Sequence, residues 1–282
     1  MIPRRLLSVL SNRLAERGGR RLPEAVLERD YCIAWFLVGL AAHPLRDRLT
    51  FKGGTALKRC YFGDYRFSED LDFTLLREMP VADIVSPLTR LFAAVRHRSG
   101  ITLGLARREP EQHANTYTFY LTYEGPLPGA AREIKVDITI RELLVSPSTL
   151  RPVLRGYDEY ADLPEDAEIR VYPLREIAIE KLVAITDPAR NEPRDLYDLW
   201  FLLDGKHVEL GDVAEGFARK LAFKGLADAS PGAALAKKEA RLKHDWERRL
   251  ASQMVILPPF DGVVRTVRRH LRQVGLLRSP GR

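Results

Sequence analysis

The chain has 282 residues, 45% of them apolar and 29% charged, with two cysteines and a net charge of +7. This length and composition exclude a disordered, collagen-like or disulfide-stapled chain and allow one large domain or two modest ones. No apolar run reaches the ~18 residues of a membrane span and the N-terminus lacks a signal-peptide pattern, so we expect a protein of the reducing cytoplasm with no membrane partner.

The basic residues are concentrated at the C-terminal end. From Arg219 onward the sequence has 15 Lys and Arg against 5 Asp and Glu, a net of +10, whereas the first 218 residues have 30 against 33, a net of −3. Such a basic end is either a solvated helical face or a surface that meets a polyanionic partner.

The first half of the chain predicts a mixture of helices and strands. Hydrophobic periodicity predicts helices over 24–42, 55–62 and 82–98, and strands over 48–52, 71–76, 101–106, 116–123 and 134–140. In the last of these strands Ile134, Val136 and Ile138 alternate with Lys135 and Asp137. This alternation is typical of a half-buried strand whose polar face carries the two charged residues.

Beyond Pro152 the pattern becomes helical. After a short predicted strand at 169–172, helical spacing extends over 174–185, 194–203, 213–223, 232–255 and 259–274. We therefore expect an α+β fold with a mixed sheet, divided into a core domain at 1–150 and a helical C-terminal domain with a basic face at 151–282.

A glycine turn connects the predicted strand over 48–52 to the predicted helix over 55–62, in the order Lys52, Gly53, Gly54 and Thr55. Two glycines at such a boundary let backbone N–H groups converge, and the following helix adds positive potential, so the turn is able to bind phosphate. The same residues also suit an ordinary tight turn.

Three carboxylates follow this turn on predicted strands. Asp70 and Asp72 are two residues apart and point to one face, and Asp137 lies on the polar face of its own strand. Carboxylate oxygens are preferred ligands of Mg²⁺, and carboxylates beside a phosphate loop are what two-metal phosphoryl or nucleotidyl transfer requires. Solvated acids on an exposed sheet face are the alternative.

These residues carry a family resemblance. The run from Gly53-Gly-Thr through Arg66-x-Ser-x-Asp-x-Asp to Lys135-Val-Asp-Ile resembles the DNA-polymerase-β-like nucleotidyltransferases, and more narrowly the AbiEii/MenT toxins of bacterial toxin–antitoxin systems. Later motifs follow in the order of that family, at Ile179-Glu-Lys-Leu-Val-Ala184, Arg194-Asp-Leu-Tyr-Asp-Leu199, His244-Asp-Trp246 and Leu257-Pro-Pro-Phe260. The resemblance covers about residues 30–270.

The resemblance implies a minimal nucleotidyltransferase core with a helical C-terminal lobe and an active site in the cleft between them. It implies NTP as substrate, two Mg²⁺ ions at Asp70, Asp72 and Asp137, and the 3′ end of tRNA as acceptor, with a cognate antitoxin as a second partner. Nucleotides added to tRNA stop aminoacylation and growth. A monomer is compatible with the sequence.

Lys181 falls on the apolar stripe of its predicted helix, where a lysine either snorkels to solvent or reaches an anion. The resemblance implies that Lys181 contacts oxygens of the triphosphate and takes part in catalysis. Asp195 lies in the first turn of the next helix, where its charge complements the helix dipole, and Arg194 and Asp198 are spaced i,i+4 as a structural pair. The resemblance implies instead that Asp195 is an active-site acid supported by Asp198.

Arg66 and Ser68 precede the catalytic strand, and we assign both, with Lys52, Gly53, Gly54 and Thr55, to nucleotide binding. Arg66 either binds a phosphate in bidentate fashion or braces Asp72, and Ser68 either caps the turn or contacts a phosphate. Phosphorylation of Ser68 would add like charge beside Asp70 and Asp72 and block the enzyme.

We assign RNA binding to the basic C-terminal residues, which then grip acceptor-stem phosphates. They are Lys237, Lys238, Arg241, Lys243, Arg248, Arg249, Arg265, Arg268, Arg269 and Arg272. Two alternative functions remain: nucleotidyl transfer to a protein or small-molecule hydroxyl, and a non-catalytic nucleotide-binding regulator.

Overall fold

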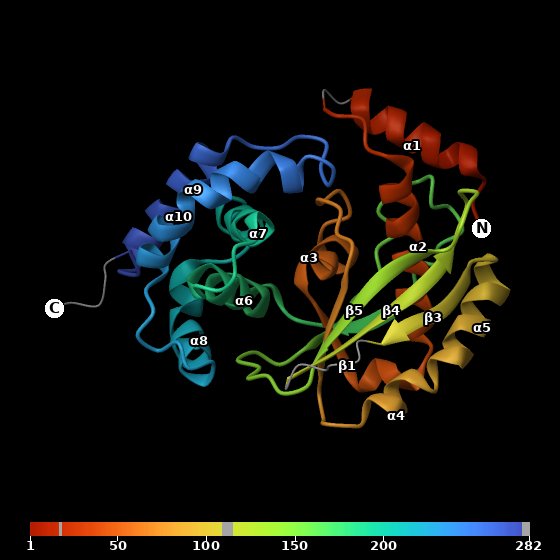
Figure 1. Ribbon diagram of the computed structural model, residues 1–282, viewed down its shortest axis with the longest axis horizontal. Helices are drawn as coiled ribbons and strands as arrows, with labels where there is room; N and C mark the ends of the chain where they lie inside the picture. The colour runs from red at the N-terminus through yellow and green to blue at the C-terminus, as the bar shows by residue number, and fades with distance from the viewer. Residues whose placement is uncertain (17–18, 109–114, 278–282) are drawn as a thin grey trace. The chain divides into compact units, whose positions relative to one another are not determined.

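The computed structural model describes residues 1–16, 19–108 and 115–277, which divide into two compact units (Figure 1). Unit 1 comprises the described residues of Met1–Glu142, Ser148–Val171 and Gln253–Val255. Unit 2 comprises Leu143–Pro147, Tyr172–Ser252 and the described residues from Ile256 onward. The chain thus leaves unit 2 after Ser252, contributes three residues to unit 1 and returns.

Unit 1 is built on one mixed sheet. Its strands in the described residues are β1 (Leu49–Lys52), β2 (Leu71–Leu75), β3 (Thr102–Arg108), β4 (Thr116–Glu124), β5 (Arg132–Thr139), β6 (Thr149–Pro152) and β7 (Glu168–Val171). They run in the order β3-β4-β5-β2-β1-β7-β6. The pairs β1–β7 and β2–β5 are parallel and the other neighbours antiparallel. The predicted α+β class with a mixed sheet is confirmed.

Helices cover this sheet within unit 1. They are α1 (Arg4–Glu16), α2 (Glu24–Ala41), the short α3 (Gly53–Ala56), α4 (Val81–Val85) and α5 (Leu88–Ser99). The apolar helix α2 packs against α5 and β7. Helix α5 packs against β3 (Figure 1). Phe51 and Phe73, on neighbouring strands, are fully buried with ring centroids 5.1 Å apart, so the apolar face of the strands beside the glycine turn is core.

Unit 2 is helical in its described residues. It contains α6 (Leu174–Thr186), α7 (Pro193–Asp204), α8 (Leu210–Phe223), α9 (Pro231–Leu250) and α10 (Phe260–Gln273). Helix α6 packs against α7, α8 and α9, and α7 also packs against α9 and α10. Within the described part of the chain, no helix combines the length and the apolar character needed to cross a membrane.

Some elements differ from their predictions. The helix predicted over 82–98 is interrupted between α4 and α5 at Pro87, because proline has no backbone N–H to donate and its ring clashes with the carbonyl four residues earlier. The helix predicted over 232–255 ends at Leu250, and Gln253 and Val255 instead form backbone hydrogen bonds with Phe67 and Arg20 in unit 1. Helix α1 and strand β6 were not predicted.

Candidate active site

The carboxylates of unit 1 are aligned by the register of its strands. Lys52 on β1 pairs with Asp72 on β2, and Asp72 pairs with Asp137 on the parallel strand β5. Paired residues of adjacent strands point to the same face and lie about 5 Å apart. The two carboxylates are therefore neighbours, while Leu71 and Phe73 on either side of Asp72 are buried.

The glycine turn lies directly against Asp72. Gly53 has a φ of +78°, a left-handed conformation that favours glycine, and a Cβ atom at this position would lie 2.7 Å from Asp72 Oδ2. Thr55 Oγ1 donates to the backbone carbonyl of Asp70 over 2.6 Å. This bond fixes the turn to the residue that enters β2, so the predicted phosphate turn and the predicted metal ligands form one structure.

Arg66 and Ser68 are buried beside the same turn. A Cβ atom at Gly54 would collide with the Arg66 guanidinium and would lie 3.4 Å from Ser68 Oγ. Arg66 Nη1 donates to the Oε1 atom of Gln253 over 3.0 Å and to the carbonyl of Phe67 over 3.2 Å. The structure thus brings both predicted nucleotide-binding side chains to Gly54.

Asp137 is engaged by its neighbours. Lys135 Nζ donates to Asp137 Oδ2 over 2.7 Å, and Thr118 Oγ1 donates to Asp137 Oδ1 over 2.6 Å. Burial by itself lowers the pKa of Lys135, but Asp137 and the charge of Asp70 raise that pKa above its ordinary value overall. Lys135 is therefore a cation within the electrostatic field of the carboxylates.

The donor set can be tested against a divalent cation. Within residues 1–16, 19–108 and 115–277, no group of three or more His, Cys, Asp or Glu side chains is arranged to hold a metal ion. Asp72 and Asp137 nevertheless provide two adjacent oxygen donors of the type that Mg²⁺ prefers. These two residues can hold a divalent cation if the Lys135 ammonium moves away from Asp137. The role of Asp70 as a third ligand stays a prediction.

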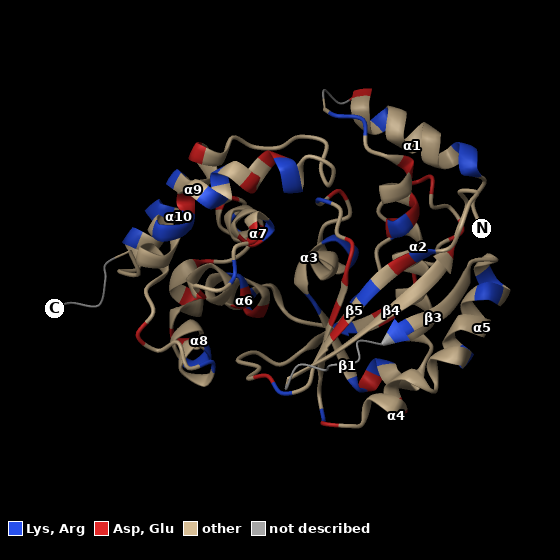
Figure 2. Cartoon of the chain, viewed as in Figure 1, with Lys and Arg blue, Asp and Glu red and all other residues tan. Residues whose placement is uncertain are grey.

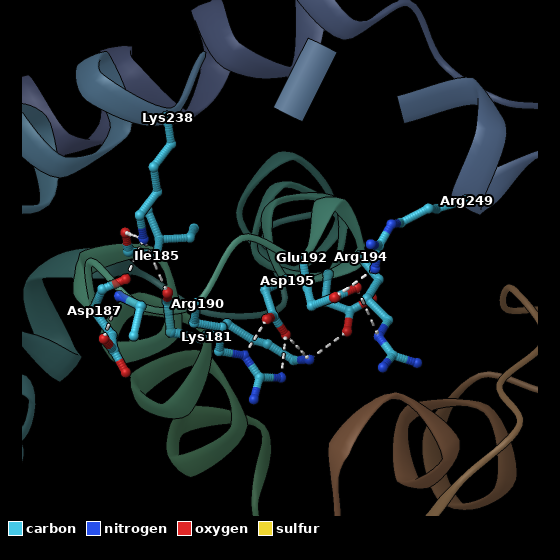
Figure 3. A network of polar contacts seen from close by, with 12 residues as sticks. Lys181, Ile185, Asp187, Arg190, Glu192, Arg194, Asp195, Lys238 and Arg249 are labelled. Carbon is cyan, nitrogen blue, oxygen red and sulfur yellow. Dashed lines mark hydrogen bonds and ion pairs between the residues drawn. The ribbon is translucent and has the colours of Figure 1, made fainter. Parts of the chain in front are cut away.

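The predicted residues of unit 2 form a separate ionic network (Figure 3). Lys181 on α6 is nearly buried, and its Nζ lies 2.7 Å from both Asp195 Oδ1 and Asp198 Oδ2 on α7. Arg190 Nε donates to Asp195 Oδ2 over 2.6 Å. Burial alone raises the pKa of Asp195, but Lys181 and Arg190 bring that pKa well below its ordinary value, so this carboxylate is ionised.

Three further side chains lie at this network, Glu192, Arg194 and Arg249. Arg194 Nε lies 3.8 Å from Glu192 Oε2, and Arg249 donates to Glu192 Oε1 over 2.6 Å. Glu192 is the residue before α7, so it links the start of that helix to α9 (Figure 3). The Lys181 ammonium thus has carboxylate partners in the structure, and its contact with a triphosphate stays a prediction.

The residues predicted to bind RNA fall into different classes. Figure 2 shows Lys and Arg along α9 and α10, interspersed with acids. Lys238 is buried: its Nζ donates to the carbonyl of Ile185 over 2.7 Å and also to that of Asp187. Cations stabilise helix C-termini, so the structure gives Lys238 a structural place at the end of α6 rather than a phosphate contact.

The other cations predicted to bind RNA are half-exposed or exposed. Four form ion pairs, namely Lys243 with Asp261, Arg248 with Asp245, Arg249 with Glu192 and Arg268 with Glu239. Exposed pairs of this kind contribute little stability and open readily, so they remain compatible with phosphate binding.

Three side chains at these sites were missed by the sequence reasoning. Thr118 holds Asp137 from a strand 19 residues earlier, Gln253 holds Arg66 across 187 residues, and Arg190 holds Asp195 from the loop before α7. Arg190 has a local signal, because it lies five residues before an acid in a helix's first turn. Thr118 and Gln253 have no such signal in the sequence, because only tertiary contacts bring them next to Asp137 and Arg66.

Comparisons with solved structures agree with this fold. Two solved Helicobacter pylori structures share the fold, the protein JHP933 and a proposed nucleotidyltransferase, each 20% identical to this chain with a TM-score of 0.57. The alignments cover 90% of this chain and 93% of JHP933, and 91% of this chain and 99% of the other protein. No curated protein sequence matches the chain.

A family model is more specific. Residues 35–266 match the family described as nucleotidyl transferase AbiEii toxin, type IV TA system. This range includes the glycine turn, the paired carboxylates and the Lys181 network. The chain belongs to the AbiEii nucleotidyltransferase toxin family.

Proposed function

We propose that this protein uses an NTP and Mg²⁺ to add nucleotides to the 3′ end of tRNA, and so blocks translation and growth. Nucleotidyl transfer and the toxin class come with the family. The nucleotide donor, the metal and the tRNA acceptor are the proposed part, and tRNA rests on the resemblance to AbiEii/MenT toxins.

One observation carries the proposal: Asp72 and Asp137 are in register on adjacent strands, and the Gly53 turn lies against Asp72. Nucleotidyl transfer needs a cradle for phosphate next to carboxylates that hold a divalent cation. A regulator that only senses nucleotides needs the cradle but not the paired carboxylates, so this arrangement favours catalysis.

The roles of the residues follow from their chemistry. Asp72 and Asp137, with Asp70 as the predicted third ligand, hold the metal, and bound Mg²⁺ supplies Lewis-acid activation and charge neutralisation. Backbone N–H groups of the glycine turn and the Arg66 guanidinium bind triphosphate oxygens. The acceptor hydroxyl oxygen bonds to the α-phosphorus and loses its proton to solvent. The bond from that phosphorus to the oxygen that bridges it to the β-phosphorus breaks, and pyrophosphate leaves with this oxygen.

The acceptor is a polyanion in this proposal. Exposed cations of α9 and α10, among them Lys237, Arg241, Arg265, Arg269 and Arg272, suit RNA phosphates. Binding through such contacts weakens steeply as salt rises. A cognate antitoxin is the second expected partner, since the family belongs to a toxin–antitoxin system.

The test is incubation of the purified protein with each α-labelled NTP, Mg²⁺ and total cellular RNA, followed by separation of RNA, protein and small molecules. Label at the 3′ end of tRNA is the expected result, with loss of transfer in Asp72→Asn and in excess chelator. Label in protein or in a small molecule would show that the acceptor is not tRNA. No transfer with any NTP would favour the non-catalytic nucleotide-binding regulator.

A further inference from the structure

Unit 2 contains a cavity of about 530 Å³, of whose lining the proposed function uses only Lys237 and Arg241, as general contacts for RNA phosphates. One face of α9 forms a wall of it, through Ser230, Ala233, Ala234, Lys237, Lys238 and Arg241. These positions follow the pattern i, i+3, i+4, i+7, i+8 and i+11, the spacing of a single helical face. The facing wall comes from the segment after α6, which includes Asn191, and from Asp228.

The order of side chains along α9 gives the cavity two different ends. Ser230, Ala233 and Ala234 are small, so they leave space beside the first turn of the helix. Lys237 and Arg241 follow one and two turns later, about 5 Å per turn along the axis. A ligand that fills the cavity therefore meets a small, largely apolar surface at one end and two cations at the other.

These two cations are available to a ligand. In the described part of the chain, neither Lys237 nor Arg241 takes part in a hydrogen bond or an ion pair, and both are exposed. Lys243, Arg248 and Arg249, further along the same helix, all have carboxylate partners. The cavity thus has a different charge environment from the rest of α9.

Lys238 makes this wall rigid. Its bonds to the carbonyls of Ile185 and Asp187 fix α9 to the end of α6 at the middle of the cavity face (Figure 3). Because Lys238 is committed to these carbonyls, it supports the shape of the cavity and leaves anion binding to Lys237 and Arg241.

The facing wall carries one amide and one carboxylate. Neither Asn191 nor Asp228 forms a hydrogen bond with another described residue. An amide offers both donor and acceptor atoms, and a carboxylate accepts from hydroxyl or amino groups. A base edge and a ribose present these groups, and a few placed polar groups in a cavity of 300–1,000 Å³ are typical of small-molecule sites.

We propose that this cavity binds a nucleoside monophosphate unit. Lys237 and Arg241 bind its phosphate, the base packs on Ala233 and Ala234, and Asn191 and Asp228 contact the base edge and ribose. The site is separate from the triphosphate turn of unit 1. If the proposed function is correct, the unit belongs to an acceptor RNA; a free nucleoside monophosphate has the same chemistry.

The experiment measures binding without catalysis. Asp72→Asn protein, without NTP, is titrated by calorimetry with adenosine and uridine 5′-monophosphate, a single-stranded hexaribonucleotide, and inorganic phosphate. We expect a nucleotide or the oligonucleotide to bind at least 10-fold more tightly than phosphate. Ala234→Leu should weaken that binding at least 10-fold by filling the cavity, and Lys237→Ala and Arg241→Ala each about 3- to 10-fold.

Matched controls make the result specific. Ala236→Leu makes the same change on an exposed part of α9, and Arg219→Ala removes an exposed cation of α8 that lies outside the cavity and has no assigned role in RNA binding. Both should bind within about 2-fold of the parent. Tight oligonucleotide binding identifies RNA as the source, and tight mononucleotide binding alone identifies a free nucleotide.

Equal affinity for phosphate and nucleotide, or equal effects of Ala234→Leu and Ala236→Leu, would overturn the inference. Transfer to RNA by the wild-type protein, measured separately, would then leave the proposed function standing. Conversely, cavity-dependent nucleotide binding with no transfer activity would sustain the inference while the proposed function failed.

Discussion

The Arg66 guanidinium donates from Nη1 to Gln253 Oε1 over 3.0 Å, across 187 residues of sequence. The backbone carbonyl of Gln253 also accepts from the Phe67 N–H over 2.6 Å. Together these bonds hold Arg66 beside Gly54, where its guanidinium leaves no room for a Cβ atom. Gln253 is thus a positioning residue for the arginine that we assign to the triphosphate.

Gln253→Ala should raise KM for the NTP about 10-fold with little change in kcat, because a hydrogen bond to a charged group contributes roughly 1.5–3 kcal/mol. The backbone bond to Phe67 survives, so the melting temperature should change little. Gln253→Glu keeps the acceptor and should restore KM. Steady-state kinetics of the three proteins measure this, and additive effects of Gln253→Ala and Arg66→Ala would contradict the positioning role.

Asp72→Asn and Asp137→Asn should each reduce nucleotidyl transfer at least about 100-fold while leaving the fold intact. Each removes a formal charge from the paired carboxylates without changing shape. Glu133→Gln is the matched control: it lies on the same strand as Asp137, but it is exposed and paired with Arg107. Transfer rates and circular dichroism spectra are compared, and wild-type rates in both Asp variants would refute the metal assignment.

Ser68→Asp should weaken NTP binding at least about 10-fold, since it places a negative charge near Gly54 and just before Asp70 and Asp72. Ser68 is buried, whereas Ser86→Asp introduces the same charge at an exposed position of unit 1 and serves as control. Affinity for a non-hydrolysable NTP analogue is the readout. Equal affinities of the two variants would remove the basis for regulation by phosphorylation at Ser68.

The local parts of the site could be predicted from sequence. Period-two alternation places Asp72 and Asp137 on polar strand faces, and the glycine pair between a strand and a helix locates the turn. The contacts of these residues depend on strand register and chain return. Thr118 reaches Asp137 because β4 pairs with β5, and Gln253 reaches Arg66 because three residues leave unit 2 for unit 1.

In the basic helix α9, too, the sequence predicts the positions of the side chains but not their contacts. Helical spacing places Lys237, Lys238 and Arg241 close together, and their sequence neighbours do not distinguish them. Packing of α9 on the end of α6 buries Lys238 against backbone carbonyls and leaves the other two exposed. Charge counts therefore predict a basic surface but not which lysine belongs to it.

Lys181→Met should lower the free energy of unfolding by about 3–5 kcal/mol, because it leaves buried Asp198 and Asp195 without their shared cation. Lys181→Met combined with Asp198→Leu should recover part of that loss. Urea unfolding of the three proteins measures it. If the single variant were as stable as wild type, Lys181 would not be required to neutralise these acids, and a triphosphate role would be favoured.

The stability of the protein should rise between pH 8 and pH 10 through Lys58. This side chain is buried, with Nζ donating to the carbonyls of Gly63 and Tyr65 over 3.0 and 3.1 Å. Burial lowers its pKa from 10.5 to about 8. Above pH 8 the folded protein has lost a proton that the unfolded chain still binds, so the free energy of unfolding increases with pH up to about 10.5.

Urea unfolding of wild type and Lys58→Met at pH 7, 8.5 and 10 isolates this contribution, since all other groups titrate in both proteins. The wild type should gain roughly 2–3 kcal/mol relative to the variant across this range. Parallel pH profiles would show that Lys58 keeps its ordinary pKa when folded. In that case the hydrogen bonds that the charged ammonium donates to Gly63, Tyr65 and Tyr157 outweigh the free-energy cost of burying its charge.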